Sequence, residues 1–424
     1  MSTLHTYLPI CKDPLGSFES LCLESHRQQM CSELQAELEI KDLEIFTSFN
    51  RLCPSCSGPM YSHGTANPRT FFAICGEVTI SLRRFRCTSC GFIHVPGTCL
   101  LPKSGVSASL AELICDLASK MSFEKANDSL FKHHGIYMST TTFWACVQKE
   151  AENFDDVLQN EANNLFNHGV YPDNCKDLRG ESPLIIGIDG GLVKKWRQKE
   201  SFEIKCATIA TGSSPCSKNS KKRSLDNRTG YAAKCSVDEF RQRISVMAYK
   251  AGYSSASTRI FVSDGASWIG KMIADYFPGA IHVLDMYHLK NKIQTFFGLN
   301  SDGVVADLLE DALIACNSYN PTNICEVISS WFPDDEKKLA DKHALLYYVS
   351  NNAQAILNHK HVSIHGSGWV EKAVDLMVSR RLKCRGMSWT FPGCSHMLPL
   401  TVLQYNKQWN LYWSYRKGLC QFPA

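Results

Sequence analysis

The chain has 424 residues, of which 44% are hydrophobic and 20% are charged, and its formal net charge is +4. The composition is ordinary for a globular protein, and the length allows two or three domains. A net charge this small excludes a chain that is basic throughout, so any basic surface must be local.

Targeting signals and cysteine usage indicate the compartment. The opening residues, "MSTLHTYLPICKDPLGSFES", lack the long apolar core of a secretory signal. No stretch approaches the ~20 apolar residues of a membrane span. We therefore expect a cytoplasmic protein, nucleoid-associated if its source is bacterial, whose 20 cysteines stay reduced. Spaced cysteines in such a chain indicate metal binding or catalysis, whereas scattered ones are small buried hydrophobic residues.

Residues 1–50 are predicted to be a helical lead-in with a packing role, and residues 51–102 a β-rich, zinc-ribbon-like module. Alternating apolar and polar residues over 77–87 indicate a strand between two Cys-x-x-Cys motifs. The motifs predict four thiolate ligands to one structural Zn²⁺: Cys53, Cys56, Cys87 and Cys90. Chance thiols and a redox pair are the alternatives. We take the neighbouring Cys75, Cys99, His63 and His94 as bystanders.

Residues 103–180 are predicted to be a small helical, DNA-binding domain. Leu110, Leu113, Ile114 and Leu117 lie on one helical face. Ser122 is placed to cap a second helix that Gly135 can end, and Ser139 to cap a third. Two short helices and a tight turn are typical of a helix-turn-helix, although a plain helical bundle has the same pattern.

Residues 181–298 alternate between apolar runs and helical patterns, which predicts an α/β layer. The expected strands cover 183–189, 202–210, 243–251, 258–265 and 280–288, and the expected helices cover 268–277 and 288–297. A polar, basic loop over 211–235 interrupts them. From Lys194 to Lys234 there are 11 Lys/Arg residues against 3 Asp/Glu residues, so the loop is a candidate phosphate-binding segment.

Residues 299–360 are predicted to be a helical insertion, in which Val305, Leu308, Leu309 and Ala312 form one apolar stripe. The segment 361–424 begins with a Gly-rich turn. A helix with Glu371 in its first turn follows, a position that acids also favour because of the helix dipole.

Asp189 and Asp264 each follow an apolar run and precede a glycine. Taken alone, either Asp-Gly pair is typical of a turn. Two such strands side by side would bring two carboxylates together, and these repel unless a proton or a cation lies between them. Mg²⁺ takes such ligands and bridges phosphate oxygens. Glu371 could complete a site for two ions, and Gly190 and Gly191 could let a nucleic-acid backbone approach.

Several stretches resemble insertion-sequence transposases of the DDE class, in particular the ISKra-type family and the related ISLre-type family. They are "GEVTISLRRFRCTSCG", "LASKMSFEKANDSL", "IIGIDGG", "VSDGASWIGKMIADYFPGAIHVLDMYHLKNKI" and "GSGWVEKAVDLMVSRRLKCRGMSWTFPG", with "WNLYW" behind them. The resemblance implies that Asp189, Asp264 and Glu371 are a catalytic triad on an RNase H-like fold interrupted by the helical insertion. One departure is Leu400-Thr401, where the family pattern has Leu-Arg.

Other residues are weaker candidates. His288 could contact DNA or the metals, or be a core or capping residue; Asp285 could be a fourth acid, although helix capping is the favoured interpretation. Trp389, Trp409 and Trp413 are expected in the core. Phosphate contacts are expected from cations near the acids, with a solvated helix face as the alternative. The candidate DNA-binding residues are Lys221, Lys222, Arg223, Arg380, Arg381, Lys383 and Arg385.

The sequence therefore predicts a DNA transposase that uses two Mg²⁺ or Mn²⁺ ions and one structural Zn²⁺. Its expected partners are the terminal inverted repeats of the element, target DNA and further copies of the chain on DNA. The zinc module and the helices of 103–180 would recognise the element ends. The alternative is a domesticated or inactive copy that only binds specific DNA. A repair nuclease on the same fold lacks support from the "GSGWVE…RGMSW" segment.

Overall fold

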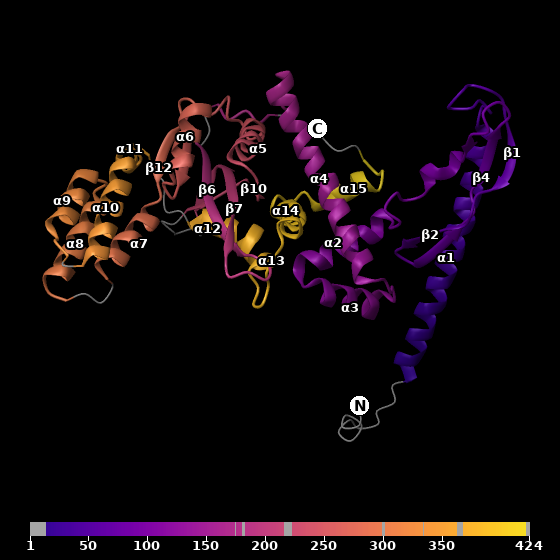
Figure 1. Cartoon of the computed structure of the whole chain (residues 1–424), viewed down its shortest axis with the longest axis horizontal. Coiled ribbons are helices and arrows are strands. Elements are labelled where there is room, and N and C mark those ends of the chain that lie inside the picture. The colour runs from indigo at the N-terminus through magenta and orange to yellow at the C-terminus, as the bar shows by residue number, and fades with distance from the viewer. Residues whose placement is uncertain are drawn as a thin grey trace. The chain divides into compact units, whose positions relative to one another are not determined.

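The computed structural model of the chain (Figure 1) describes residues 14–173, 175–179, 183–215, 223–298, 302–333, 335–362 and 368–420. The chain divides into two compact units. One contains the residues up to Glu150 together with residues 413–420, and the other extends from Ala151 to Tyr412. Across the described residues, every helix is too short or too polar to span a membrane.

The first unit begins with the long helix α1 (Pro14–Ser48), which packs against two small sheets. Strands β1 (Met60–Thr65), β4 (Arg83–Cys87) and β5 (Ile93–His94) form one, and the hairpin β2 (Arg69–Ala73) and β3 (Gly76–Ile80) forms the other. The expected helix and β-rich module are confirmed over the described residues. The single strand expected over 77–87 is two strands in different sheets.

Helix α1 covers both sheets with apolar side chains, which fits its expected packing role. Leu34 and Leu38 lie against the cluster that contains Val78 and Ile80. Phe46 stacks on Phe85 with ring centroids 4.2 Å apart. The short helix η1 (Pro96–Leu100) also contacts α1.

Three helices follow, and their predicted caps are confirmed. Helices α2 (Ala108–Lys120) and α3 (Phe123–His134) are separated by two residues. The Ser122 hydroxyl accepts from the Lys125 amide, and Gly135 ends α3 with φ of 64°. Ser139 Oγ accepts from the Thr142 amide at 3.0 Å at the start of α4 (Thr140–His168).

The second unit is built on a five-stranded mixed sheet, which confirms the α/β prediction. It comprises β6 (Leu184–Lys194), β7 (Ser201–Thr211), β10 (Thr229–Ala233), β11 (Arg259–Ser263) and β12 (Ile281–Leu284). Their order is β10-β7-β6-β11-β12. β7 is antiparallel to both of its neighbours, whereas β6, β11 and β12 are parallel. The small ladder β8 (Ser213–Pro215) and β9 (Arg223–Leu225) lies in the basic loop.

One face of this sheet packs against α5 (Val237–Lys250) and α6 (Ser267–Tyr276). The strand expected over 243–251 is wrong, because this segment belongs to α5. Ser236 and Glu239 form a capping box at its start, and Phe240, Ile244 and Ala248 repeat every four residues into the core. Strand β10, within the expected loop, was not predicted.

A helical subdomain follows β12, as the sequence predicts. Leu308, Leu309 and Ala312 of the predicted stripe join its apolar core. Its elements are α7 (Met286–Phe297), α8 (Val304–Asn317), α9 (Pro321–Ser330), α10 (Glu336–Asn351), α11 (Ala353–Leu357) and η2 (Asn358–Lys360).

The chain then returns to the sheet as one helical rod with a π-helical segment in its middle. The rod comprises α12 (Gly368–Val374), η3 (Asp375–Ser379) and α13 (Arg380–Leu382). Helices α14 (Phe391–Tyr405) and α15 (Trp409–Arg416) complete the chain. Thr401, the departure from the family pattern, is buried and donates to the Met377 carbonyl at 2.7 Å. It therefore fixes α14 to the π-helical segment.

Candidate functional site

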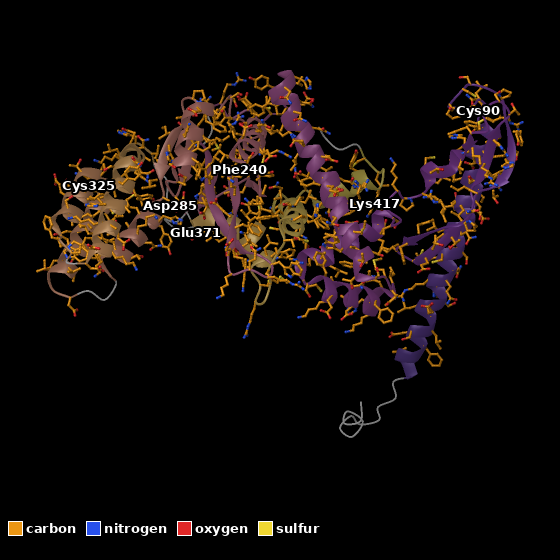
Figure 2. The ribbon with its side chains drawn as sticks, in the orientation of Figure 1. Cys90, Phe240, Asp285, Cys325, Glu371 and Lys417 are labelled. Carbon is orange, nitrogen blue, oxygen red and sulfur yellow. The ribbon has the colours of Figure 1, made fainter. Side chains whose placement is uncertain are left out.

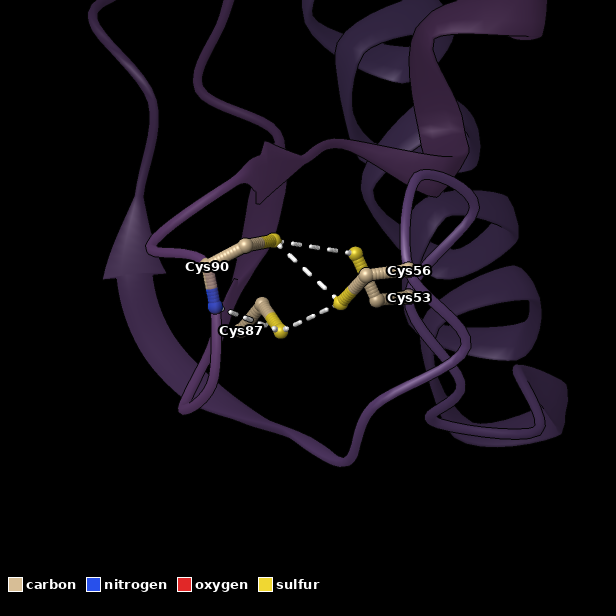
Figure 3. Close-up of side chains that lie close together, drawn as sticks. All are labelled: Cys53, Cys56, Cys87 and Cys90. Atoms are coloured by element: carbon tan, nitrogen blue, oxygen red, sulfur yellow. Dashed lines mark hydrogen bonds between the residues drawn. The ribbon is translucent and has the colours of Figure 1, made fainter.

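The first candidate site is a cluster of four cysteines in the first unit (Figure 3). The predicted ligands Cys53, Cys56, Cys87 and Cys90 converge, with their sulfurs all within 4.8 Å of one another. The Sγ–Sγ distances are 3.7 Å for Cys53–Cys90, 3.5 Å for Cys56–Cys87 and 3.4 Å for Cys56–Cys90. Zn–S bonds of about 2.3 Å in a tetrahedron separate sulfurs by about 3.8 Å. The cluster therefore fits a Zn²⁺ ion.

Both Cys-x-x-Cys turns have the same backbone hydrogen bonds. The Cys53 amide donates to Gly58 O, and the Cys87 amide donates to Phe92 O, each at 2.9 Å. The amides of Cys90 and Ser89 donate to the Cys87 sulfur, and these bonds lower the pKa of Cys87 to about 6. A thiolate is the form that binds zinc, so this turn favours metal binding at Cys87. At Cys56 the Gly58 backbone lowers the pKa, but hydrogen bonds with Cys90 and Cys87 raise it to about 12.

The second candidate site is an edge of the five-stranded sheet where three acids meet. Ile188, Ser263 and Leu284 are aligned in register on the adjacent parallel strands β6, β11 and β12. The next residue along each strand is an acid: Asp189, Asp264 and Asp285. The parallel register thus brings together three carboxylates that are distant in sequence.

Local hydrogen bonds orient each carboxylate. Asp189 accepts from the Gly190 amide at 2.7 Å, Asp264 from the Ala266 amide at 3.0 Å, and Asp285 from the Tyr287 amide at 2.9 Å. Asp285 is the N-cap of α7, as the sequence favours. Each of these bonds engages one oxygen, Oδ1, whereas the other oxygen of Asp285 faces His288.

Glu371 and His288 join this edge from two helices. Ligand atoms of Asp285, His288 and Glu371 all lie within 4.8 Å of one another (Figure 2 labels Asp285 and Glu371). His288 Nε2 is 3.5 Å from Asp285 Oδ2. Asp285 is therefore both a helix cap and a member of the acid group. Carboxylates and an imidazole at this spacing are a donor set for a divalent cation.

The electrostatics of Asp189 also favour a cation. Burial raises the pKa of Asp189, and the carboxylates of Asp264 and Asp285 raise it further, whereas the Gly190 amide and His288 lower it. Its ionised form is therefore disfavoured unless a positive charge lies nearby. A metal ion would supply that charge. The strand expected to end at Asp189 continues to Lys194, so this acid lies inside β6 rather than at its end.

The glycines of β6 make room for the helix that carries Glu371. A Cβ at Gly187 would overlap Val370 and lie 2.7 Å from Cη2 of Trp369. At Gly191 it would lie 3.1 Å from a Val378 methyl carbon. The sequence predicts that Gly190 and Gly191 leave space for a nucleic-acid backbone. This prediction is wrong for Gly191, because the helical rod fills that space. At Gly190 a Cβ would lie 2.5 Å from Glu203 Oε1.

Replacing Gly187 with alanine is expected to push α12 away from β6. The free energy of unfolding should fall by about 1–3 kcal/mol, the usual cost of overpacking, and urea denaturation of the full chain measures it. Gly368→Ala is the matched control at the start of the same helix, because a Cβ there meets no side chain within 4 Å among the described residues. Equal stability of the two variants would contradict this close packing.

Two residues of the helical subdomain hold the backbone at Asp264 through hydrogen bonds. Neither residue was predicted from the sequence. The Tyr348 hydroxyl donates to the Asp264 carbonyl at 2.5 Å. The buried Asn352 side chain donates to the Gly265 carbonyl at 3.3 Å. Both residues line a cavity of about 680 Å³ beside Asp264. Because their pattern is that of any amphipathic helix, only the three-dimensional contacts identify their role.

The candidate DNA-binding residues have different positions. Lys221 and Lys222 lie outside the described residues, as does the side chain of Arg223. Arg380, Lys383 and Arg385 are exposed. Arg381 is buried, its guanidinium 4.8 Å from the Trp389 ring centroid, and burial lowers its pKa to about 10. Arg381 is therefore removed from the predicted DNA contacts, because its charge faces the interior.

The fold and sites define a mixed α/β protein with an acid-rich site and a four-cysteine site. A family model matches residues 105–410, which include all the acids of the sheet edge but not the four cysteines. The chain therefore belongs to UPF0236, an uncharacterised protein family. The search of curated proteins gave no match.

Proposed function

We propose that this chain is a DDE-class DNA transposase of the ISKra type, with Asp189, Asp264 and Glu371 as its catalytic acids. The observation that carries the proposal is the register of β6, β11 and β12, which places Asp189, Asp264 and Asp285 at equivalent positions on adjacent parallel strands. Of these three acids, Asp285 lies within 4.8 Å of Glu371. The mixed sheet, in which only β7 is reversed, supports an RNase H-like core.

The acids have distinct tasks in this proposal. Asp189 and Asp264 share one Mg²⁺ or Mn²⁺, and Glu371 completes the site for a second from the facing helix. Two bound ions would activate a water or hydroxyl and stabilise the leaving oxygen of a phosphodiester. Asp285 and His288 extend the donor set and hold Glu371 in range, since their ligand atoms lie within 4.8 Å of one another. The reaction is cleavage at the element ends, followed by attack of the freed 3′-hydroxyl on target DNA.

The first unit has a separate role in this proposal. A structural Zn²⁺ on the four cysteines would order residues 51–102, and this module with α2 and α3 would recognise the element ends. The supporting observations are the tetrahedral spacing of the sulfurs and the short turn between α2 and α3. The chain would act as a homo-oligomer on DNA.

Glu371→Gln tests the acid site through two readouts. The affinity for Mn²⁺, measured by calorimetry on zinc-loaded protein, should fall at least about 10-fold. Even residues that contact a metal only indirectly contribute about 10–100-fold to its affinity. Mn²⁺-dependent nicking of a plasmid that carries the DNA flanking this gene should fall with it. Glu336→Gln, in the first turn of α10, is the matched control. Unchanged Mn²⁺ affinity and nicking in Glu371→Gln would reject the assignment.

A further inference from the structure

The ribbon formed by β6 and β7 ends in an exposed aromatic residue covered by a cation. Beyond Gly190 these strands pair only with each other among the described strands. At the tip, Trp196 is 50% exposed, and the Arg197 guanidinium lies 4.2 Å from its ring centroid. Arg197 has a left-handed backbone with φ of 55°. The tip thus presents a large flat ring and a positive charge to solvent.

A second exposed ring lies on the adjoining backbone. The Trp196 amide donates to Trp389 O, and the Trp389 amide donates to Lys194 O, both at 2.9 Å. Two residues further along the chain, Phe391 is 48% exposed. Its ring centroid lies 5.9 Å from Lys195 Nζ and 5.7 Å from Lys234 Nζ. Two exposed aromatic rings, each accompanied by cations, therefore belong to one small region.

The same region carries cations that no acid neutralises. Trp389 Nε1 donates to Leu382 O at 3.0 Å and so closes a short loop that contains the exposed Lys383 and Arg385. Within the described part of the chain, Arg197, Lys199 and Arg385 form no ion pair, whereas Glu200 pairs with Lys195. The local charge is therefore positive although the whole chain is nearly neutral.

We propose that this hairpin-tip surface, formed by Trp196, Arg197, Lys199, Lys383, Arg385 and Phe391, binds an unpaired DNA strand. Cations bind phosphates of any DNA, but ring faces can stack only on bases that are not paired and stacked in a duplex. The choice of DNA rests on the proposed function, but the inference concerns binding alone and does not depend on metal at the acids. Strand β6 continues from Asp189 to Lys194, about 17 Å of extended chain, and Trp196 follows two residues later in the turn.

The test compares the affinity for a fluorescent ten-nucleotide thymidine strand with that for a duplex of equal length. Fluorescence anisotropy is measured without Mg²⁺ or Mn²⁺, so that no cleavage interferes. Trp196→Ala should weaken single-strand binding by about 5-fold or more, the effect of losing one stacked base. Trp196→Phe should retain most of the affinity. Phe332→Ala is the matched control, because Phe332 is exposed and has Lys342 Nζ 4.3 Å from its ring centroid.

Salt dependence supplies a second, independent readout. Lys199→Ala should reduce the slope of log affinity against log salt by about 0.7, the value for one phosphate of a single strand. Lys338→Ala, a cation over Trp331, should leave the slope unchanged.

Unchanged single-strand affinity in Trp196→Ala, an equal loss in Phe332→Ala, or a loss confined to duplex binding would each overturn the proposal. Because the binding test contains no divalent metal and measures no cleavage, this inference and the proposed cleavage can fail separately.

Discussion

Replacing Asp264 with asparagine is expected to abolish metal-dependent DNA cleavage and to leave DNA binding intact. The substitution removes a charge but little volume, and the Ala266 amide that bonds to the Asp264 side chain still has an oxygen to donate to. The cation that the carboxylate holds would be lost, so we expect cleavage to fall at least about 100-fold, beyond the 10–100-fold effect of a metal's outer partners. Binding should persist or tighten slightly, because one repulsion with phosphates disappears.

Strand cleavage and gel-shift affinity are measured together at fixed salt, since affinity depends steeply on salt. The DNA is the sequence that flanks the gene. Asp275→Asn, an exposed acid in the last turn of α6, is the matched control and should cut normally. If the unaltered chain binds but never cuts with Mg²⁺ or Mn²⁺, the chain is a DNA-binding protein rather than a transposase. If Asp264→Asn cuts normally, Asp264 is only a turn residue.

Replacing Cys87 with serine is expected to remove about one equivalent of zinc per chain and to loosen residues 51–102. Structural zinc contributes about 10–16 kcal/mol of binding free energy in small modules, and that energy is also folding energy. The two sheets here have small apolar clusters, one of which is formed by Cys53, Met60, Phe85 and Cys87. The pairing of Met60 with Cys87 and the bonds from Thr88 to the Pro59 carbonyl also join the two turns, so loosening rather than complete unfolding is expected once a ligand is lost.

Metal analysis of purified protein gives the zinc content, and hydrogen exchange reports the opening of the module. Cys99→Ser is the matched control, because Cys99 is an exposed thiol in the same segment and lies outside the four-cysteine cluster. Zinc that survives Cys87→Ser, or that is lost equally in Cys99→Ser, would contradict the assignment.

Features that depend on neighbours in sequence could be predicted in detail, whereas strand register could be predicted only in part. The expected adjacency of the strands that carry Asp189 and precede Asp264 is confirmed. The caps at Ser122 and Ser139 depend on residues within one helical turn, and both are confirmed. The pattern at Asp189 and Asp264 predicts an acid at a strand end, which is correct for Asp264 after β11 but not for Asp189, because β6 continues to Lys194. Only the pairing of β11 with β12 shows that Asp285 stands beside them. Its capping role was correctly expected, but a cap is compatible with many positions in a fold.

The errors also have physical causes. The segment 243–251 is dense in apolar residues, which suits a buried strand as well as a buried helix. The deciding signal was the Ser236–Glu239 capping box upstream of it. Gly191 was assigned to an external ligand, although the space beside it belongs to Val374 and Val378, nearly two hundred residues away. Sequence spacing alone contains no information about such a packing partner.

The π-helical segment of the rod determines the angle around the helix axis between the side chain of Glu371 and those of Arg380 and Arg381. An α-helical residue advances by about 100° around the axis, since a turn takes 3.6 residues. A π turn holds one residue more, so everything after Asp375–Ser379 is rotated relative to the acid before it. In the observed phase Arg381 faces Trp389 and Arg380 faces solvent. A one-residue deletion there would preserve both ends of the rod and still misalign them, so this stretch should tolerate changes of residue far better than changes of length.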